Sequence, residues 1–305
     1  LQSRGLGDVY KRQPMGSAKQ ADRVRQQLHR PPLKVIAVTS GKGGVGKTAV
    51  AANLSVALAS ARQNTLLFDA DMGLANVDVM LGLQPSFNLA HVASGETDLD
   101  STILTGPCGV RIVPASSGDF SMLDLKPDAQ ASIIAAFSHM ADQPDVLLVD
   151  TAAGLSDSVA RFVQATQEAI VVICDEPASI TDSYALIKVL SRRYGVSHFQ
   201  VITNQTRNHA NGRALFDKVR RVTDRYLDVV MRHLGDIPDD SMLRRSIQEQ
   251  QAVVHAYPRS ESARAFRRIA SRIASQPAGR YRSGGIEFFF ERILQAGGQT
   301  HRRIA

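Results

Sequence analysis

Residues 40–48 read Ser-Gly-Lys-Gly-Gly-Val-Gly-Lys-Thr, and this stretch decides the fold. It follows the apolar run Val35–Val38 and precedes Val50–Ala59, a run of mostly small and apolar residues that predicts a helix. The spacing G-x-x-x-x-G-K-T is typical of a loop that surrounds phosphate oxygens with backbone N–H groups. The following helix directs its positive end at the same anion. The sequence therefore predicts a strand, a phosphate-binding loop and a helix in succession; a glycine turn without a ligand would not require this context.

The last two residues of the loop have distinct expected roles. The Lys47 ammonium should reach the β- and γ-phosphates of a nucleotide, and the Thr48 hydroxyl should bind Mg²⁺. The other positions contact phosphate through their backbone. The predicted nucleotide contacts of this segment are Gly41, Lys42, Gly43, Gly44, Val45, Gly46, Lys47, Thr48 and Ala49.

Carboxylates end two further apolar runs, residues 65–71 (TLLFDAD) and 145–150 (DVLLVD). The carboxyl ends of parallel strands face the ligand crevice of an open α/β sheet. Asp69 and Asp150 are therefore placed to support Mg²⁺, and Asp71 to orient an attacking water or to take its proton. The alternative role of an aspartate in such a segment is to cap the next helical turn.

Strands and helices alternate along the rest of the chain. The pattern predicts strands over Val110–Pro114, Ala169–Asp175, Phe199–Asn204 and Leu227–Leu234, and helices over residues 129–140, 179–192, 212–222 and 266–274. This alternation is typical of a single α/β domain. We expect residues 33–275 to form a doubly wound, mostly parallel sheet with helices on both faces.

The two ends of the chain differ from this domain. Residues 1–14 contain a segment that resembles the translation of a sequencing adapter, and we interpret them as a non-native leader. Residues 15–32 form a basic arm, in which Lys19–Leu28 predicts a short helix that either is disordered or becomes ordered on a partner. Residues 276–285 contain proline and glycines and predict a linker to a separate tail, residues 286–305.

The tail begins with a predicted amphipathic helix of about three turns. Its apolar face consists of Ile286, Phe289, Phe290, Ile293 and Leu294. Such a helix can lie on an anionic membrane surface, where nearby arginines add attraction to lipid, or dock in a groove. The alternative is that it folds back onto its own domain, and both arrangements are compatible with different nucleotide states.

Composition excludes several classes of function. The 305-residue chain contains no run of about 18 apolar residues, so a membrane span is not predicted. Its two cysteines, Cys108 and Cys174, form no C-x-x-C pair, which favours the cytoplasm and argues against a cysteine-rich metal site. The net charge of +7 is compatible with an anionic membrane or nucleic acid as a partner.

A second lysine inside the loop, Lys42, is not required for phosphate binding alone. With this lysine, the segment GKGGVGKT resembles the deviant Walker A motif of the MinD/ParA family of ATPases. The resemblance implies a MinD-like P-loop fold, with ATP and Mg²⁺ as cofactors. It also implies a homodimer that forms on ATP binding, in which Lys42 of each subunit reaches the nucleotide of the other.

The same resemblance assigns roles to residues outside the loop. It gives catalytic roles to Lys42, Lys47 and Asp71, and places Asp69 in the outer shell of the metal. It also implies that Asn204 contacts adenine and that the loop containing Pro238 packs around the base. For Asn204, a simple role as a turn residue at a strand end is the alternative.

Within this family, the sequence is most similar to the FlhG group of flagellar-number regulators. The similar segments are DADMGLANVDVMLGL (69–83), LLVDTAAGLSDSV (147–159), CDEPASITDSYALIK (174–188) and GIEFFFERIL (285–294). This resemblance implies a switch that regulates flagellar number and placement, peripheral on the inner face of the cell membrane in its ATP state. The implied partners are an FlhF-like GTPase, a flagellar AAA+ transcription activator and flagellar switch-complex proteins. The arm keeps only part of the group's D-Q-A-x-x-L-R motif, because Lys19 and Val24 replace the aspartate and the leucine.

Other ATPases of the family remain as alternatives. A ParA-type DNA-partition ATPase would bind nucleic acid through a basic face, for which the candidate residues are Arg259, Arg264, Arg267, Arg268 and Arg272. The aromatic tail argues against this alternative, and we expect no direct binding of nucleic acid. A metallocluster carrier would need a cysteine pair at its dimer interface, and a scaffold without hydrolysis would not need the three aspartates.

Overall fold

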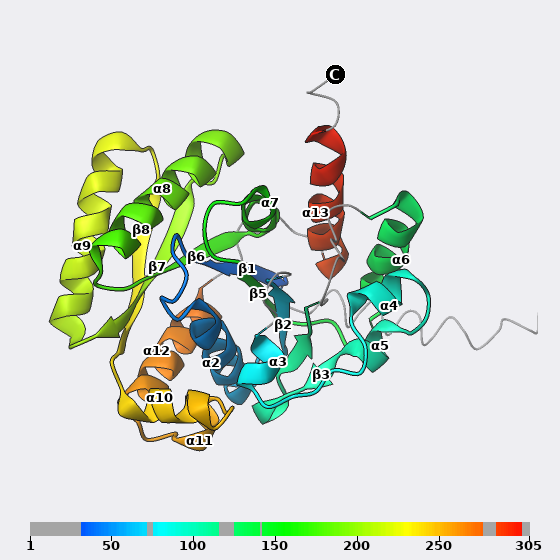
Figure 1. The fold of residues 1–305 in the computed structure, drawn as a ribbon, viewed down its shortest axis with the longest axis horizontal. Coiled ribbons are helices and arrows are strands. Elements are labelled where there is room, and N and C mark those ends of the chain that lie inside the picture. Colours follow the sequence, from blue (N-terminus) through cyan, green and yellow to red (C-terminus); the bar gives the residue numbers. More distant parts are fainter. Residues whose placement is uncertain (1–31, 72–75, 116–124, 141, 277–284, 301–305) are drawn as a thin grey trace, which may run out of the picture. The chain divides into compact units, whose positions relative to one another are not determined.

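The computed structural model describes residues 32–71, 76–115, 125–140, 142–276 and 285–300, with side chains of the last segment as far as Leu294. The expected leader, nearly all of the basic arm and the greater part of the linker lie outside these residues. The remaining chain, from Leu33 onward, forms one compact unit built on a β-sheet (Figure 1).

A sheet of eight strands lies at the centre of the described chain, in the order β3-β4-β2-β5-β1-β6-β7-β8. The strands are β1 (Lys34–Thr39), β2 (Thr65–Ala70), β3 (Leu104–Thr105), β4 (Arg111–Val113), β5 (Val146–Thr151), β6 (Glu168–Ile173), β7 (His198–Thr206) and β8 (Val230–Pro238). Only β3, at one edge of this sheet, runs antiparallel to its neighbour. The predicted doubly wound, mostly parallel sheet is therefore confirmed.

Helices cover both faces of the sheet (Figure 1). On one face lie α2 (Lys47–Ser60), α10 (Ser241–Gln248), α11 (Val253–Ala256) and α12 (Glu261–Ser275). On the other lie α4 (Leu89–Ala93), α6 (Pro127–Ser138), α7 (Asp157–Ala165), α8 (Pro177–Tyr194), α9 (His209–Tyr226) and α13 (Ile286–Thr300). The short elements α3 (Val77–Met80), α5 (Leu99–Thr102) and the 3-10 turn η1 (Pro107–Gly109) join the strands near the β3 edge.

Strand β1 contributes apolar side chains to the cores on both faces of the sheet. Ile36 and Val38 pack with the α2 and α12 side, whereas Val35 and Ala37 pack with the opposite helices. Successive side chains of a strand point to opposite faces, so a strand covered on both sides needs a continuous apolar run rather than an alternating one. The continuous apolar runs at 35–38, 146–149 and 169–173 therefore predict central strands.

The position of β8 differs from the prediction. The sequence predicts a strand that begins at Leu227, whereas β8 begins at Val230 and continues to Pro238. Helix α9 extends to Tyr226, and the Leu227 backbone N–H donates to the Thr223 carbonyl in a closing turn. Leu227 therefore belongs to the turn that ends α9. An apolar residue at the start of a strand would give the same sequence signal.

The C-terminal helix α13 folds back onto its own domain. The five side chains of its predicted apolar face are buried, with at most 3% of any of them exposed. Phe290 stacks on Phe137 of α6 at a ring-centroid distance of 3.8 Å and meets Phe68 of β2 edge-on. Phe288, which breaks the amphipathic pattern, is 46% exposed. The docked arrangement, one of the two alternatives left open by the sequence, is therefore the one in this structure.

Candidate functional site

The predicted phosphate loop connects the carboxyl end of β1 to the first turn of α2 (Figure 1). Gly44 and Gly46 have left-handed φ angles of 82° and 85°, which side chains with a Cβ rarely adopt. Gly41 has an ordinary φ, but a Cβ there would meet the Asp182 backbone at 2.3 Å. The glycine pattern therefore reflects two different constraints, left-handed backbone and close packing against α8.

The amino end of α2 is open to an anion. Among the described residues no side chain caps this end, and the first turn of the helix contains no acidic residue. Its free backbone N–H groups and helix dipole therefore favour a negatively charged ligand. Gly43 and Gly44 are exposed at the crest of the loop, whereas Val45 is buried beneath it and anchors the loop in the core.

Lys47 is held beside the predicted metal-supporting aspartate of β5. Its Nζ atom lies 2.7 Å from Asp150 Oδ1, 3.3 Å from Thr48 Oγ1 and 4.0 Å from Asp71 Oδ2. Burial raises the pKa of Asp150, and the Lys47 ammonium opposes that rise. The structure thus brings together residues that are up to 103 positions apart in the sequence.

Asp69 occupies the same position on β2 that Asp150 occupies on β5, because the two residues are in register. Its carboxylate accepts backbone N–H groups of Asp71, Asn76 and Val77 at 3.1–3.3 Å. Burial, and secondarily the charge of Asp150, raise the pKa of Asp69 to about 7. Asp69 therefore fixes the start of the segment after β2. Residues 72–75 of that segment lie outside the described residues.

Few protein oxygens are available for a metal ion beside Lys47. In the described part of the chain no group of three or more His, Cys, Asp or Glu side chains is arranged to hold a metal by itself. Mg²⁺ commonly keeps several waters and uses one or two protein oxygens together with phosphates. Asp150 Oδ2 is buried without a hydrogen-bond partner in this part of the chain, and Thr48 lies beside it. These groups fit a hydrated Mg²⁺.

Lys42 pairs with a different carboxylate from those beside Lys47. Its ammonium lies 2.6 Å from Glu176 Oε2 at the start of α8, and this hydrogen bond raises the pKa of Lys42. Both side chains are well exposed, so the pair is an exchangeable surface ion pair. Sequence reasoning missed Glu176, although an acidic residue directly after an aspartate-ended strand was a possible signal. The first residue of the loop is also tied to the segment after β5, because Gly154 N–H donates to the Ser40 carbonyl.

Asn204 lies against the phosphate loop. Its Nδ2 atom donates to the Val45 carbonyl at 2.8 Å, and a Cβ on Gly46 would collide with it. Its Oδ1 atom is buried and has no hydrogen-bond partner among the described residues. Pro238 ends β8 nearby, since it pairs with Thr206 two residues beyond Asn204. Asn204 thus positions the loop and still has one free acceptor; contact with adenine stays a prediction.

None of the described helices is both long and apolar enough to cross a membrane.

Comparisons with known proteins agree with this geometry. The family model ParA, described as NUBPL iron-transfer P-loop NTPase, matches residues 33–274. The chain is 52% identical over 264 residues to the antiactivator FleN of Pseudomonas aeruginosa. The aligned residues make up 87% of this chain and 94% of FleN. The chain is 29% identical over 266 residues to the flagellum site-determining protein YlxH of Helicobacter pylori, covering 86% of this chain and 90% of YlxH.

Solved structures of MinD have the same fold. The cell division ATPase MinD of Pyrococcus furiosus matches with a TM-score of 0.63 and 26% identity, over 79% of this chain and 98% of MinD. MinD of Pyrococcus horikoshii, complexed with Mg-ADP, matches with a TM-score of 0.62 and 27% identity, over 80% of this chain and 96% of that MinD. The match over residues 33–274 and the identity to FleN confirm the predicted family. The chain belongs to the ParA family of P-loop NTPases and is MinD-like.

Proposed function

We propose that the protein is an ATP-dependent dimerising switch that hydrolyses ATP to ADP and regulates flagellar number and placement. The observation that carries this proposal is the arrangement of Lys47, Asp150 and Asp71 beside a glycine loop that contains a second lysine. The identity to the antiactivator FleN over 94% of its length and the similarity to YlxH support the flagellar role.

The chemistry of hydrolysis follows from the position of each side chain. Backbone N–H groups of the loop and of the first turn of α2 bind the phosphates, and Lys47 leaves Asp150 to bind the β- and γ-phosphate oxygens. Asp71, less than one-fifth exposed and 4.0 Å from Lys47, orients the attacking water. Thr48, with Asp150 and Asp69 in the outer shell, would hold Mg²⁺, which would supply positive charge to neutralise the charge that develops on the phosphates.

Adenine is bound at the side of the loop where β7 and β8 end. The free Oδ1 of Asn204 accepts a hydrogen bond from the amino group of the base, while its Nδ2 stays on the Val45 carbonyl. The backbone near Pro238 packs against the ring. This arrangement accounts for a buried, half-satisfied amide, which would otherwise be a cost to stability.

Lys42 connects hydrolysis to dimerisation. In the dimer it exchanges Glu176 for a phosphate of the nucleotide bound to the other subunit. Glu176 is 54% exposed, so the cost of breaking the existing ion pair is small. Exposed Val79 and Leu155, which follow the two aspartate-ended strands, become part of the interface. The active site is therefore complete only in the dimer.

The docked α13 limits membrane binding to one state of the switch. The side chains that would enter the lipid are the same five that are buried in the domain, so the helix must undock before it binds a membrane. Dimerisation on ATP provides this release, and two helices on one dimer bind an anionic membrane more tightly than one. An FlhF-like GTPase, a flagellar AAA+ activator and switch-complex proteins are the proposed protein partners.

One experiment tests the proposal as a whole. ATP turnover, molecular mass and sedimentation with vesicles are measured on the same protein, with ATP or ADP and with anionic or neutral lipid. We expect slow turnover, a dimer with ATP, and sedimentation that requires both ATP and anionic lipid. A monomer with ATP, or no turnover, would contradict the switch. Salt-sensitive binding of the ATP form to random DNA would instead favour the ParA-type alternative.

A further inference from the structure

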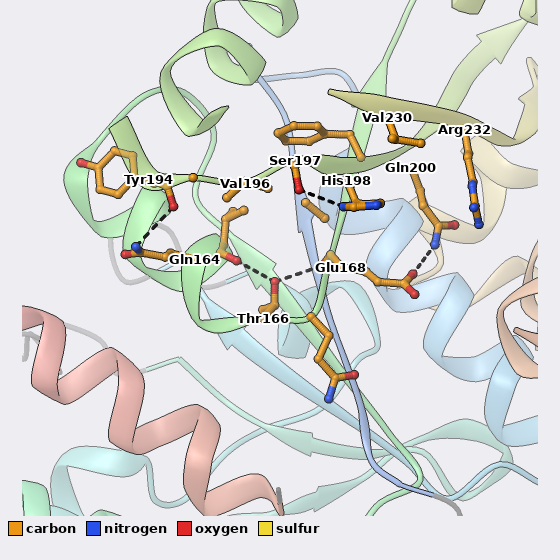
Figure 2. Close-up of a pocket in the computed structure, with 15 residues that line it drawn as sticks. Gln164, Thr166, Glu168, Tyr194, Val196, Ser197, His198, Gln200, Val230 and Arg232 are labelled. Carbon is orange, nitrogen blue, oxygen red and sulfur yellow. Dashed lines mark hydrogen bonds between the residues drawn. The ribbon is translucent and has the colours of Figure 1, made fainter. Parts of the chain in front are cut away.

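A cavity lies at the opposite end of the sheet from the phosphate loop. It has a volume of about 650 Å³ and is bordered by the amino ends of β6, β7 and β8 and by the turns that precede them (Figure 2). The phosphate loop follows the carboxyl end of β1, so the length of a strand, roughly 20 Å, separates the two sites. Apolar side chains form much of its wall: Val163, Ala169, Val196, Phe199 and Val230.

A second cavity of about 480 Å³ adjoins the first, and the two share Gln200 and Arg232. Among the described residues that line it, five carry basic or imidazole side chains and none is acidic. The five are His209, Arg213, Arg232, His233 and Arg272. Arginine is well suited to bind phosphate, because its planar guanidinium donates two parallel hydrogen bonds. Three of the five already have charged or carbonyl partners: His209 pairs with Asp236, Arg213 pairs with Asp217, and Arg272 donates to the Leu234 carbonyl. Among the described residues of this cavity, Arg232 is therefore the cation best placed to bind a phosphate group.

Gln200 lies at the junction of the cavities with an unsatisfied acceptor. The residue is only 7% exposed, and its Nε2 atom donates to Glu168 Oε2 and, at 3.0 Å, to Gln276 Oε1. Its Oε1 atom has no partner in the part of the chain that the structure describes. Buried amide oxygens are nearly always hydrogen-bonded. A ligand with an N–H or O–H donor would supply the missing bond.

Two charged side chains flank this amide. Figure 2 shows the Gln200 amide between the carboxylate of Glu168 and the guanidinium of Arg232. Arg232 forms no ion pair or hydrogen bond within the described residues, and it is exposed to the cavity. Burial raises the pKa of Glu168, while Lys34 and Arg232 oppose that rise. The junction thus offers acceptors on one side and a cation on the other.

We propose that the two cavities form one binding site for a nucleotide whose base presents adjacent N–H donors, which among the common bases is guanine. The base lies in the apolar cavity and donates to Glu168 and to Oε1 of Gln200, and its phosphate binds Arg232 and the basic cavity. Guanine carries N–H donors on neighbouring atoms, whereas adenine places an acceptor nitrogen beside its amino group and would oppose the carboxylate. The volume of each cavity is within the range of ligand sites.

Equilibrium dialysis of the full chain with GMP tests this site. We expect GMP to bind, to bind more tightly than AMP and ribose 5-phosphate, and to stay bound in excess Mg·ADP, because the phosphate loop is elsewhere. No binding of GMP, equal binding of the three probes, or displacement of GMP by Mg·ADP would each overturn the proposal. GMP binding at this site needs neither hydrolysis nor dimerisation. Failure of the proposed switch would therefore leave the result of this experiment unaffected.

Two substitutions test the phosphate contact and the base contact separately. Arg232→Ala should weaken GMP binding about tenfold through loss of a charged hydrogen bond to phosphate. Glu168→Gln keeps an acceptor for Gln200 but removes the carboxylate, so it should weaken GMP about tenfold and leave AMP unchanged. Arg221→Ala, an exposed arginine of α9 outside both cavities, is the matched control and should have no effect. Equal GMP affinity in all three variants, with unchanged thermal unfolding, would contradict the site.

Discussion

The Nζ atom of Lys47 lies 2.7 Å from Oδ1 of Asp150, and the two side chains are 7% and 1% exposed. Breaking a buried ion pair by removing one partner is costly, because the other charge stays buried without compensation. The pair therefore links the stability of the domain to Lys47, the residue that we propose binds nucleotide phosphate.

The first prediction concerns this pair. Lys47→Met should lower the free energy of unfolding at pH 7 by about 3 kcal/mol, because Asp150 loses its cation. Adding Asp150→Asn should recover at least half of the loss, since the remaining side chain is neutral. Urea denaturation of the two single variants and the double variant measures the coupling. Strictly additive effects would show that the contact contributes no stability.

The second prediction concerns Asp69, whose pKa burial raises from 3.8 to about 7. The folded state then binds a proton more tightly than the unfolded state, so the stabilising contribution is complete below about pH 4 and is lost as pH rises through 7. At about 1.4 kcal/mol per pH unit, the loss is about 4 kcal/mol.

Asp69→Asn removes the titrating group and should flatten this part of the stability profile, whatever its effect on absolute stability. Urea denaturation at several pH values between 4 and 8 measures both proteins. Parallel profiles for the wild type and the variant would show that Asp69 does not titrate in this range.

Much of the fold followed from the sequence because its signals are local. The glycine loop, the apolar runs of the central strands and the aspartates at their ends each needed only neighbouring residues for interpretation. The pair of Lys42 with Glu176 and that of Lys47 with Asp150 are 134 and 103 residues apart, so only their convergence at one end of the sheet reveals them. The short strand β3 has two residues and carries no periodic signal.

The tail shows a different limit of sequence reasoning. The apolar face of residues 286–294 was evident from its spacing, but the same face fits lipid or a groove of the domain equally well. In this structure the face packs on Phe68 and Phe137, which belong to distant segments of the sequence. Periodicity identifies the surface that is buried, and only the tertiary structure identifies the partner.

The third prediction tests docking of α13. Phe290→Ala removes the ring that stacks on Phe137 and should undock the helix, because truncation of a buried Phe costs about 3–5 kcal/mol. Hydrogen exchange in residues 286–294 should become faster, because the undocked helix no longer shields its backbone against the domain. Phe288→Ala is the control, because its ring is exposed and does not hold the helix in place. Similar exchange rates in the two variants would show that stacking on Phe137 does not control docking.

The fourth prediction separates hydrolysis from dimerisation. Asp71→Ala should lower turnover of ATP by about 10²-fold or more, because a general base or water-orienting group contributes about that much. The variant should still form a dimer with ATP, since the phosphate loop is unchanged. Phosphate release and molecular mass are measured on the same sample. Turnover at the wild-type rate would remove Asp71 from catalysis.

The measurement that tests the central claim most directly is the molecular mass in solution of the Lys42→Ala variant with Mg·ATP, measured by light scattering beside the wild type. Glu176→Ala serves as the control, because it breaks the same ion pair and leaves Lys42 in place. We predict a dimer for the wild type and for Glu176→Ala, and a monomer that still binds ATP for Lys42→Ala. A dimer of Lys42→Ala equal to that of the wild type would contradict the account.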